Sequence, residues 1–389
     1  MTNQGTGRDT IVEWLQNNEA AMIALLEELV SIDSGSRDKP GIDAVGNVLI
    51  RFYAEHAMPV TRTPAEVNGD ILAFRNPAAI GGNKPFLLMG HRDTVFTKGE
   101  VARRPFRITD GRGYGPGVAD MKAGLVMNAF VAAALQRFRP DIPVMALATG
   151  DEEIGSPFSR PHIEEAARGA RVVFNSEPGR VTGNIVNGRK GGLTFKLDVE
   201  GRAAHSGVNY SEGRSAIDVL ARKIIALHAL SRVDDGLTIN VGVITGGTTV
   251  NTVAPQASAE VDLRYVTPEQ RAAVLADIAA IVAHTEMPDT KAEFTIRSEF
   301  LPLVETSESA VITRAYLQTA RSFGSEIAAE FTGGCADSGF TASVGTPTIC
   351  GAGPVGGKAH TVDEYIEVNT LLERATFAAA TILSLHDQA

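Results

Sequence analysis

The sequence predicts an α/β protein in which a mainly parallel sheet is flanked by helices and interrupted by an inserted α+β domain. In the first half of the 389 residues, apolar runs of strand length alternate with helical stretches. From Gly192 onwards, strands with alternating polar and apolar residues replace them, and after Phe300 the first pattern returns. We therefore expect residues 1–186 and 297–389 to form a main domain and residues 187–296 to form the insert.

The main domain is expected to begin with an amphipathic helix at residues 10–32, followed by a loop at 33–41. Strands that alternate with helices usually pair in parallel, because each helix carries the chain back across the sheet. The elements expected next are strands at 85–90, 143–149 and 171–174 and helices at 121–138 and 160–168.

The insert shows alternating strand patterns separated by helical periodicity, which predicts a compact α+β unit. Its strands are expected at 193–201, 237–247 and 257–266, and its helices at 214–230 and 267–284. The main domain should then be completed by a helix at 307–323, a glycine-rich segment at 333–339, a strand at 347–351 and a terminal helix from Val368.

The composition excludes several classes of protein. Hydrophobic residues make up 44% and charged residues 21%, and no apolar run is expected to approach the roughly 20 residues of a membrane helix. A net charge of −10 argues against nucleic acid as a partner. Residues 1–10 show no secretory signal, and Cys335 and Cys350 are too few for a disulfide framework. We expect a cytoplasmic protein.

Acidic or imidazole residues directly follow three of the predicted strands. His91 and Asp93 follow the first strand, residues 151–153 (Asp-Glu-Glu) follow the second, and Glu177 follows the third. Ligand sites in open α/β sheets lie beyond the carboxyl ends of the strands, so these residues should converge. Any one of these clusters alone would be interpreted as solvated loop acids, but three in register favour a site.

The glycine-rich segment at 113–124 places Asp120 where a loop enters a helix. A dinucleotide-binding loop is one interpretation, but the glycine spacing is wrong and a carboxylate there would repel a pyrophosphate. A helix N-cap is another interpretation, and metal binding is a third.

Imidazole nitrogens and carboxylate oxygens suit a pair of divalent ions, which share one bridging carboxylate. The remaining Glu152 is then a candidate general base, and Asp93 is placed to orient the imidazole two residues before it. The residues that supply the ligand set are His91, Asp120, Glu153, Glu177 and His360.

Six segments, taken in order, resemble the metallopeptidase family of glutamate carboxypeptidase, aminoacylase, peptidase T and succinyl-diaminopimelate desuccinylase. The resemblance extends from about residue 20 to the C-terminus, and the carboxypeptidase-like members are the most similar. The segments are MGHRDTV, GPGVADMKAG, TGDEEIGS, NSEPGR, EGRAAHSG and GPVGGKAHTVDEY.

The resemblance implies a role for each matching residue. His91 and Glu177 would hold one metal ion, Glu153 and His360 the other, and Asp120 would bridge them. Glu152 would be the catalytic base, and Asp93 would orient His91. It further implies that the main domain is catalytic, that the insert is a lid and dimerisation domain, and that His205 acts in a partner subunit's active site. Without the resemblance, His205 would be interpreted as structural.

Substrate contacts are implied for Asn251 and Arg264, whose guanidinium group suits a carboxylate. A strand Arg is equally compatible with a surface position. Gly333 and Gly334 resemble a pair whose backbone lines the substrate site, with Cys335 where a small uncharged residue is expected. The basic residues Arg189 and Lys190, at the start of the insert, are either solvated or substrate-facing.

We therefore expect a homodimeric hydrolase with two divalent ions, most simply zinc, with cobalt or manganese as alternatives. It should cleave an amide bond beside a free carboxylate and release an amino acid, preferentially acidic, from a small N-acyl amino acid or peptide. The alternatives are an aminohydrolase or aminopeptidase with the same metal site, and a non-catalytic binding protein with this fold. Retention of Glu152 argues against the last alternative.

Overall fold

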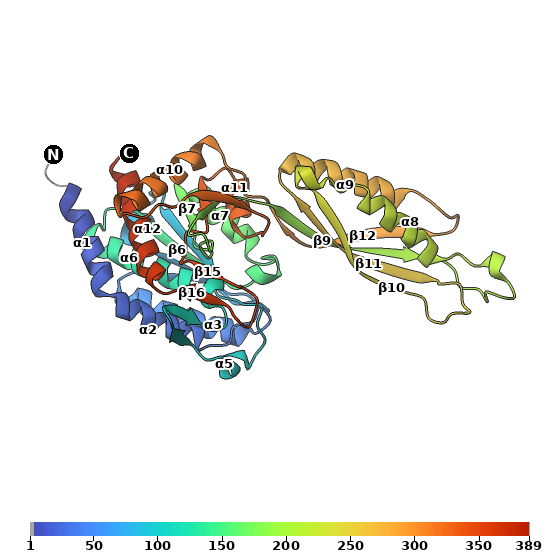
Figure 1. Ribbon diagram of the computed structural model, residues 1–389, viewed down its shortest axis with the longest axis horizontal. Helices are drawn as coiled ribbons and strands as arrows, with labels where there is room; N and C mark the ends of the chain where they lie inside the picture. Colours follow the sequence, from blue (N-terminus) through green and yellow to red (C-terminus); the bar gives the residue numbers. More distant parts are fainter. Residues whose placement is uncertain (1–3, 389) are drawn as a thin grey trace. The chain divides into compact units, whose positions relative to one another are not determined.

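The computed structural model describes residues 4–388, which form two compact units (Figure 1). The main unit comprises the chain up to Gly188, Glu305–Thr332 and the chain from Ala336. The insert unit comprises Arg189–Val304 together with Gly333–Cys335. The insert was expected at residues 187–296. In the structure, strand β12 (Lys291–Phe300) extends beyond residue 296, the predicted end of the insert.

The main unit is built on an eight-stranded sheet with the order β1-β2-β6-β3-β7-β14-β8-β13. Strands β6, β3, β7 and β14 pair in parallel, which confirms the predicted mainly parallel sheet. Every residue of β3 and β6 is buried, as expected for strands covered on both faces. The bounds are β1 Val60–Thr63, β2 Ile71–Arg75, β3 Phe86–His91, β6 Val144–Thr149, β7 Val172–Asn175, β8 Ile185–Arg189, β13 Ala329–Thr332 and β14 Thr348–Cys350.

Helices flank this sheet. Helices α1, α6 and α12 pack against one another, α10 packs against α12, and α7 packs against α11 (Figure 1). A small antiparallel sheet, β15-β16-β5-β4, completes the unit. The bounds are α1 Gln4–Asn17, α2 Glu19–Val30, α3 Lys39–Glu55, α4 Pro77–Ile80, α5 Glu100–Arg103, η1 Val118–Lys122, α6 Ala123–Phe138, η2 Glu152–Ile154, α7 Arg160–Gly169, α10 Ser307–Ser322, α11 Ser338–Ser343, α12 Asn369–Asp387, β4 Arg107–Thr109, β5 Arg112–Tyr114, β15 Gly356–Gly357 and β16 Tyr365–Glu367.

The first predicted helix was wrong in one respect, because residues 10–32 contain two helices that meet at Asn18. The Asn18 side chain donates to the Trp14 carbonyl at 2.8 Å and so takes the acceptor that the next turn of α1 would use. Helix α3 was not predicted. It begins after Asp38, whose carboxylate accepts the Gly41 N–H at 3.4 Å, with Pro40 in its first turn.

One helical stretch of the described residues reaches the length of a membrane span. Helical residues Val118–Phe138 are long and apolar enough to cross a membrane by length and composition, but 94% of that window is buried inside the protein. The stretch includes α6, which packs against β3, β6 and α12. It is therefore the central core helix of the main unit.

The insert unit is a four-stranded antiparallel sheet with the order β10-β11-β9-β12, covered by α8 and α9 (Figure 1). Apolar residues alternate along β9 and β11 and face the two helices in a separate core. Strand β12 was not predicted. The bounds are β9 Gly191–Glu200, η3 Tyr210–Glu212, α8 Ala216–His228, η4 Val233–Asp235, β10 Thr238–Gly246, β11 Gln256–Tyr265, α9 Pro268–Ala283 and β12 Lys291–Phe300.

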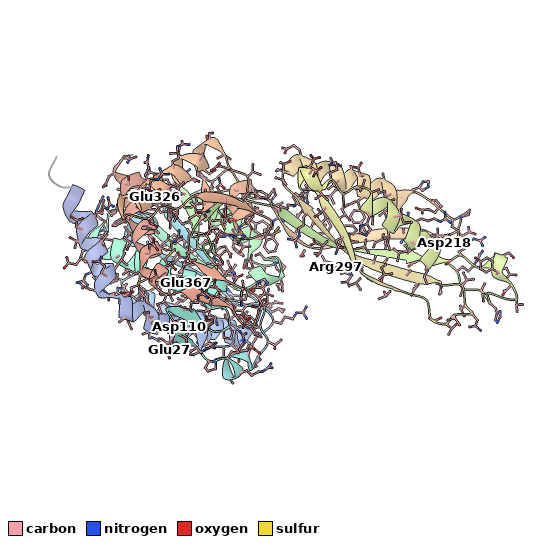
Figure 2. All side chains as sticks on the ribbon, in the orientation of Figure 1. Glu27, Asp110, Asp218, Arg297, Glu326 and Glu367 are labelled. Carbon is pink, nitrogen blue, oxygen red and sulfur yellow. The ribbon has the colours of Figure 1, made fainter. Side chains whose placement is uncertain are left out.

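Charged side chains cover the surface of both units, and Figure 2 labels examples on each. Glu367 accepts from Arg112 at 2.8 Å, and Asp218 accepts from Arg222 at 3.2 Å. Both pairs are exposed to solvent, so each contributes little to stability.

Asp70 is a buried carboxylate that holds two basic side chains in the main unit. It pairs with Lys39 and Arg62 and accepts the Ala65 backbone N–H at 3.0 Å. Burial alone would raise the pKa of Asp70, but these hydrogen bonds lower it from 3.8 to about 2. The folded state therefore favours the carboxylate form.

We expect Asp70→Asn to lower the free energy of unfolding by about 1 to 2 kcal/mol at neutral pH. The folded-state pKa is the lower one, so this contribution is fully present above pH 3.8 and is lost as the pH falls through about 2. Denaturant unfolding of both proteins across this range measures the difference. A gap that does not change with pH would contradict this role.

Candidate metal centre

The candidate residues lie at one edge of the main sheet because of the parallel pairing. His91 is the last residue of β3 and pairs with Thr149, the last residue of β6. Residues 151–153 follow β6, and Glu177 follows β7, which pairs with β3 on its other side. The expected convergence at the carboxyl ends of the strands is thus observed.

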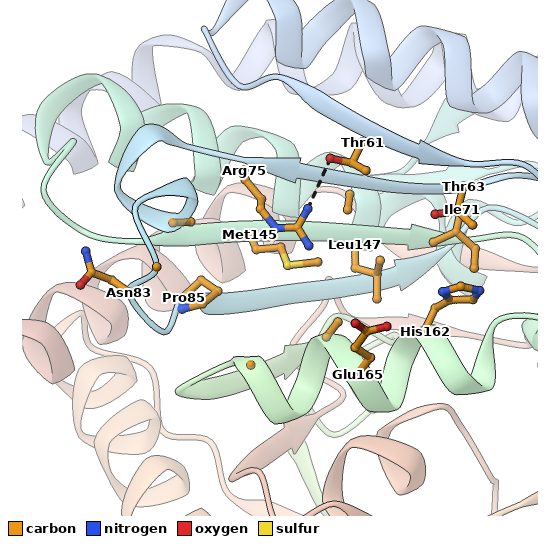
Figure 3. A pocket seen from close by; sticks show the side chains of 15 residues that line it. Thr61, Thr63, Ile71, Arg75, Asn83, Pro85, Met145, Leu147, His162 and Glu165 are labelled. Atoms are coloured by element: carbon orange, nitrogen blue, oxygen red, sulfur yellow. Dashed lines mark hydrogen bonds between the residues drawn. The ribbon is translucent and has the colours of Figure 1, made fainter.

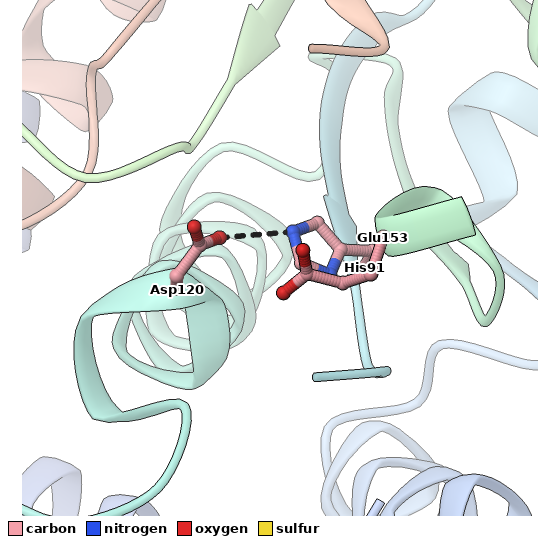
Figure 4. Close-up of side chains that lie close together, drawn as sticks. All are labelled: His91, Asp120 and Glu153. Carbon is pink, nitrogen blue, oxygen red and sulfur yellow. Dashed lines mark hydrogen bonds and ion pairs between the residues drawn. The ribbon is translucent and has the colours of Figure 1, made fainter. Parts of the chain in front are cut away.

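Asp120 lies between the two histidines. Its Oδ1 is 3.1 Å from His91 Nε2, and its Oδ2 is 3.3 Å from His360 Nε2. His360 Nε2 also lies 3.2 Å from Glu153 Oε2. Figure 4 shows Asp120 facing a ring nitrogen of His91, with the Glu153 side chain overlapping the His91 ring in this view. The ligand atoms of His91, Asp120 and Glu153 all lie within 4.8 Å of one another, as expected of groups that could hold an ion.

A second group contains His91, Glu152 and Glu177, whose ligand atoms also lie within 4.8 Å of one another. Glu152 Oε2 and Glu177 Oε1 are each 3.8 Å from His91 Nε2. Distance therefore does not distinguish Glu152 from Glu177 as a ligand, and their different roles rest on the family resemblance.

Asp93 connects the loop that follows β3 with the loop that follows β6. Its carboxylate accepts the backbone N–H groups of Glu152 and Glu153, each at 3.1 Å, and the Ser36 hydroxyl at 2.8 Å. His91 Nδ1 lies 3.4 Å from Asp93 Oδ1 and 3.0 Å from its backbone carbonyl. The Asp93 carboxylate therefore fixes the backbone of Glu152 and Glu153.

The pKa values of these groups reflect crowded carboxylates in a buried place. Burial raises the pKa of Glu152 well above its usual value; His91 opposes this shift, and Glu177 reinforces it. Burial would likewise raise the pKa of Asp120, but its hydrogen bonds with both histidines lower that pKa. Hydrogen bonds to Asp120 and Glu153 raise the pKa of His360 to about 10. The carboxylates thus favour a positive charge between them, either on an imidazole or on a bound cation.

The donor set fits divalent cations. It consists of imidazole nitrogens and carboxylate oxygens, which such ions prefer. Glu153 Oε1 is buried and makes no hydrogen bond to any residue between 4 and 388, so it is an acceptor with no protein partner. A cation at this position would supply that partner and offset the repulsion between the carboxylates.

In the insert unit, Arg264 and Arg189 both contact the 333–335 segment. Arg264 donates from Nε to Asp262 at 2.9 Å and from Nη1 to Cys335 Sγ at 2.8 Å. Arg189 is buried and donates from Nη1 to the Gly334 carbonyl at 3.1 Å and to the Cys335 carbonyl at 3.3 Å. Arg189 is therefore not a solvated hinge residue, and Cys335 is a direct neighbour of Arg264.

The structure also brings His205 and Asn251 together. His205 forms an isolated antiparallel β-bridge with Thr252, and the Ser206 N–H donates to the Asn251 carbonyl at 2.9 Å. The Gly207 N–H donates to His205 Nδ1 at 3.1 Å, so the proton of the neutral ring is on Nε2. Lys190 lies apart from this pair, against Gly236.

Two buried acids beside the candidate ligands were missed by the sequence reasoning. Asp337 accepts the Ser156 hydroxyl at 2.5 Å, and burial raises the pKa of Asp337 to about 8. Glu364 accepts three backbone N–H groups, and burial raises its pKa to about 7. The position of Glu364 four residues after His360 does not distinguish it from an ordinary solvated acid in a loop.

A cavity of about 560 Å³ adjoins the metal centre, because Glu153 forms part of its wall. Its other walls are the segments 35–38 and 94–98, with Ile154. A separate cavity of about 390 Å³ lies between α7 and strands β1, β2 and β6, where Figure 3 shows Arg75, His162 and Glu165. The second cavity shares no residue with the metal centre, so only the first is relevant to its chemistry.

Known proteins resemble this chain over most of its length. Residues 87–384 match the family model described as Peptidase family M20/M25/M40. Carboxypeptidase G2 of a Pseudomonas species is 27% identical over 377 residues, which cover 95% of this chain and 90% of that protein. Succinyl-diaminopimelate desuccinylase of Stenotrophomonas maltophilia is 31% identical over 313 residues, which cover 75% of this chain and 81% of that protein.

Solved structures resemble the chain in fold. Aminopeptidase PepT from Bacillus cereus has a TM-score of 0.77 at 23% sequence identity, with 95% of this chain and 99% of that chain covered. An M20 family metallo-carboxypeptidase from Sulfolobus solfataricus has a TM-score of 0.74 at 18% identity, with 95% and 99% covered. Similarity at these identities establishes the shared fold alone.

We expect Glu153→Gln to weaken one divalent metal site, because its carboxylate is the acidic partner of His360. Glu152→Gln should keep both ions and lower turnover by about 10² to 10⁴, the usual effect of losing a general base. Elemental analysis after dialysis against a limiting chelator measures the metal content. Glu177→Gln is the matched control, since Glu177 lies as far from His91 as Glu152 does and should lose metal.

The reverse result, in which Glu152→Gln loses an ion and Glu177→Gln keeps both, would exchange the roles of these two glutamates.

Proposed function

The chain belongs to Peptidase family M20/M25/M40, whose members are metal-dependent carboxypeptidases and amidohydrolases, and it is a hydrolase of peptide or amide bonds. From that premise we propose that it uses two divalent ions, most simply zinc, to release a C-terminal amino acid, preferentially acidic, from an N-acyl amino acid or small peptide. The observation that carries this proposal is the position of Asp120 between His91 and His360, with Glu152 beside them.

In this proposal, His91 and Glu177 would hold one ion, His360 and Glu153 would hold the other, and Asp120 would serve both. The bound ions supply positive charge that polarises the scissile carbonyl and lowers the pKa of water. Glu152 accepts the proton from the attacking water and delivers it to the leaving nitrogen. Burial shifts its pKa upwards, the direction that favours a group that must both take and return a proton.

Arg264 is proposed to bind the substrate's free carboxylate. Its Nη2 makes no hydrogen bond to any described residue, whereas Nε and Nη1 are held by Asp262 and Cys335. A thiol is a weak acceptor, so the contact with Cys335 positions Arg264 without competing strongly with a carboxylate. Asn251 and the backbone of Gly333 and Gly334 are proposed as further contacts. Arg189 supports that backbone, and Lys190 remains a candidate for the acidic side chain.

The acyl side of the substrate is proposed to occupy the cavity beside Glu153. Val95 and Ile154 on its walls are 42% and 38% exposed, so apolar surface adjoins a cluster of charged ligands. The remaining proposals follow the family resemblance: residues 187–296 act as lid and dimerisation domain, Asp93 orients His91, and the enzyme works in the cytoplasm.

The insert sheet offers a surface on which two copies could pair. Strand β10 is at the edge of this sheet, and its Val243 and Ile244 are 50% and 59% exposed. An exposed edge strand with apolar residues is a template for pairing with another chain. On the adjoining helix α8, Ile225 is 72% exposed. We therefore propose a homodimer through the insert unit, in which His205 acts across the interface.

We expect metal-loaded enzyme to hydrolyse N-acyl-glutamate faster than N-acyl-alanine, and both faster than N-acyl-glutamate α-amide. Loss of the charge-assisted contact to Arg264 should lower kcat/KM by about ten- to a hundredfold. Arg264→Lys should lose most of this discrimination, because an ammonium lacks the planar fork. Release of free amine measures each rate. Arg222→Lys on α8 is the control for an exposed insert arginine and should behave as wild type.

Equal rates for the glutamate and alanine substrates would contradict the preference for an acidic residue. Equal rates for the acid and the amide would contradict the proposed contact between Arg264 and the substrate carboxylate. Absence of turnover on every N-acyl amino acid and dipeptide would contradict the proposed function itself.

For the dimer, we expect mixed subunits of His205→Ala and Glu152→Gln to recover activity that neither variant has alone. With free exchange, half the dimers are mixed and each has one intact site, so about a quarter of wild-type activity should return. His228→Ala, a histidine on the exposed face of α8, is the control and should be active without mixing. Light scattering that shows a fully active monomer would refute the interface.

A further inference from the structure

Glu364 is a buried carboxylate that satisfies three backbone N–H groups of another loop. The residue is 1% exposed, and its oxygens accept from Gly117 at 3.1 Å, Ala119 at 2.8 Å and Asp120 at 3.0 Å. These N–H groups belong to Gly117 and the segment η1, whose residues Asp120 and Met121 depart from helical backbone angles. Glu364 therefore supplies the acceptors for this irregular backbone, from a position about 245 residues further along the chain.

The same side chain joins the loops of two proposed metal ligands. One of the three N–H groups is that of Asp120, whose two carboxylate oxygens face His91 and His360. Glu364 lies four residues after His360, and its own N–H donates to the Thr361 carbonyl at 3.4 Å. A shift of Glu364 would therefore move the backbone of Asp120 relative to that of His360.

Close packing leaves these two loops little freedom to adjust. A Cβ added at Gly356 would lie 2.7 Å from the Ala119 side chain, so the His360 loop and the Asp120 loop are in direct contact. Gly117 has a φ of +70°, and a Cβ there would lie 2.4 Å from Thr94. The backbone that Glu364 binds is thus held in one conformation by its neighbours.

We propose that Glu364 is a positioning residue that sets the separation of Asp120 and His360 and thereby the affinity of the metal centre. This inference rests on the proposed dinuclear site. Both oxygens are needed, because Oε2 accepts from Gly117 while Oε1 accepts from Ala119 and Asp120. A glutamine can replace only one of these oxygens, since its NH₂ group would face an N–H donor.

The test compares Glu364→Gln and Glu364→Ala with wild type by titrating zinc into the metal-free protein against a competing chelator. Loss of such a supporting contact typically weakens metal binding about 10- to 100-fold. We expect a loss of this size for Glu364→Ala and a smaller loss for Glu364→Gln, with turnover of Glu364→Gln recovering at high zinc concentration. Circular dichroism of the metal-free variants checks that they fold.

Asp70→Asn is the matched control, because Asp70 is also a buried carboxylate that accepts a backbone N–H in the main unit but contacts no proposed ligand. It should lower stability and leave zinc affinity unchanged. Wild-type zinc affinity in both Glu364 variants, or an equal loss in Asp70→Asn, would overturn the inference. If wild-type protein bound no pair of divalent ions, the proposed function would fail instead, whatever the Glu364 variants did.

Discussion

Repulsion between carboxylates at one edge of the main sheet is the constraint on which the site depends. Asp120, Glu152, Glu153 and Glu177 all lie close to the His91 or His360 imidazole, in a region where burial already disfavours charge. Such a cluster is stable only if positive charge lies among the carboxylates or if they take up protons. The protein supplies two imidazoles, and Glu153 Oε1 accepts no hydrogen bond from the residues that the structure describes, which is the arrangement expected of residues that share cations.

Holding these carboxylates together requires backbone support, and the structure provides it twice in the same chemical form. Asp93 accepts the N–H groups of Glu152 and Glu153, and Glu364 accepts those of Gly117, Ala119 and Asp120. Hydrogen bonds from backbone N–H groups stabilise a buried carboxylate and at the same time fix the loop that donates them. Each ligand-bearing loop is thus tied to a carboxylate that is not itself a proposed ligand.

The sequence was sufficient to predict the main sheet and the cluster of acidic and imidazole side chains at its edge, because both follow from local patterns. Continuous apolar runs identified β3, β6 and β7, and the residues directly after them are those that meet in space. The break between α1 and α2 at Asn18 depends on one hydrogen bond from the Asn18 side chain to the Trp14 carbonyl, and the hydrophobic periodicity of the sequence does not reveal it. Helix α3 had a local signal in Asp38 and Pro40. Glu364 had none that separated it from a solvated acid, since its partners are remote in sequence.

The two units carry different parts of the proposed chemistry, and their construction differs accordingly. In the main unit, the candidate ligands His91 and Glu177 and the proposed base Glu152 are buried and lie at or just beyond the ends of core strands. In the insert unit, His205 and Asn251 lie on exposed turns, and Arg264 is held by one carboxylate and one thiol. Groups that position ions must be rigid to within a fraction of an ångström, whereas groups that recognise a substrate must admit and release it. Substitutions in the insert are therefore the natural route to a change of substrate without loss of the metal centre.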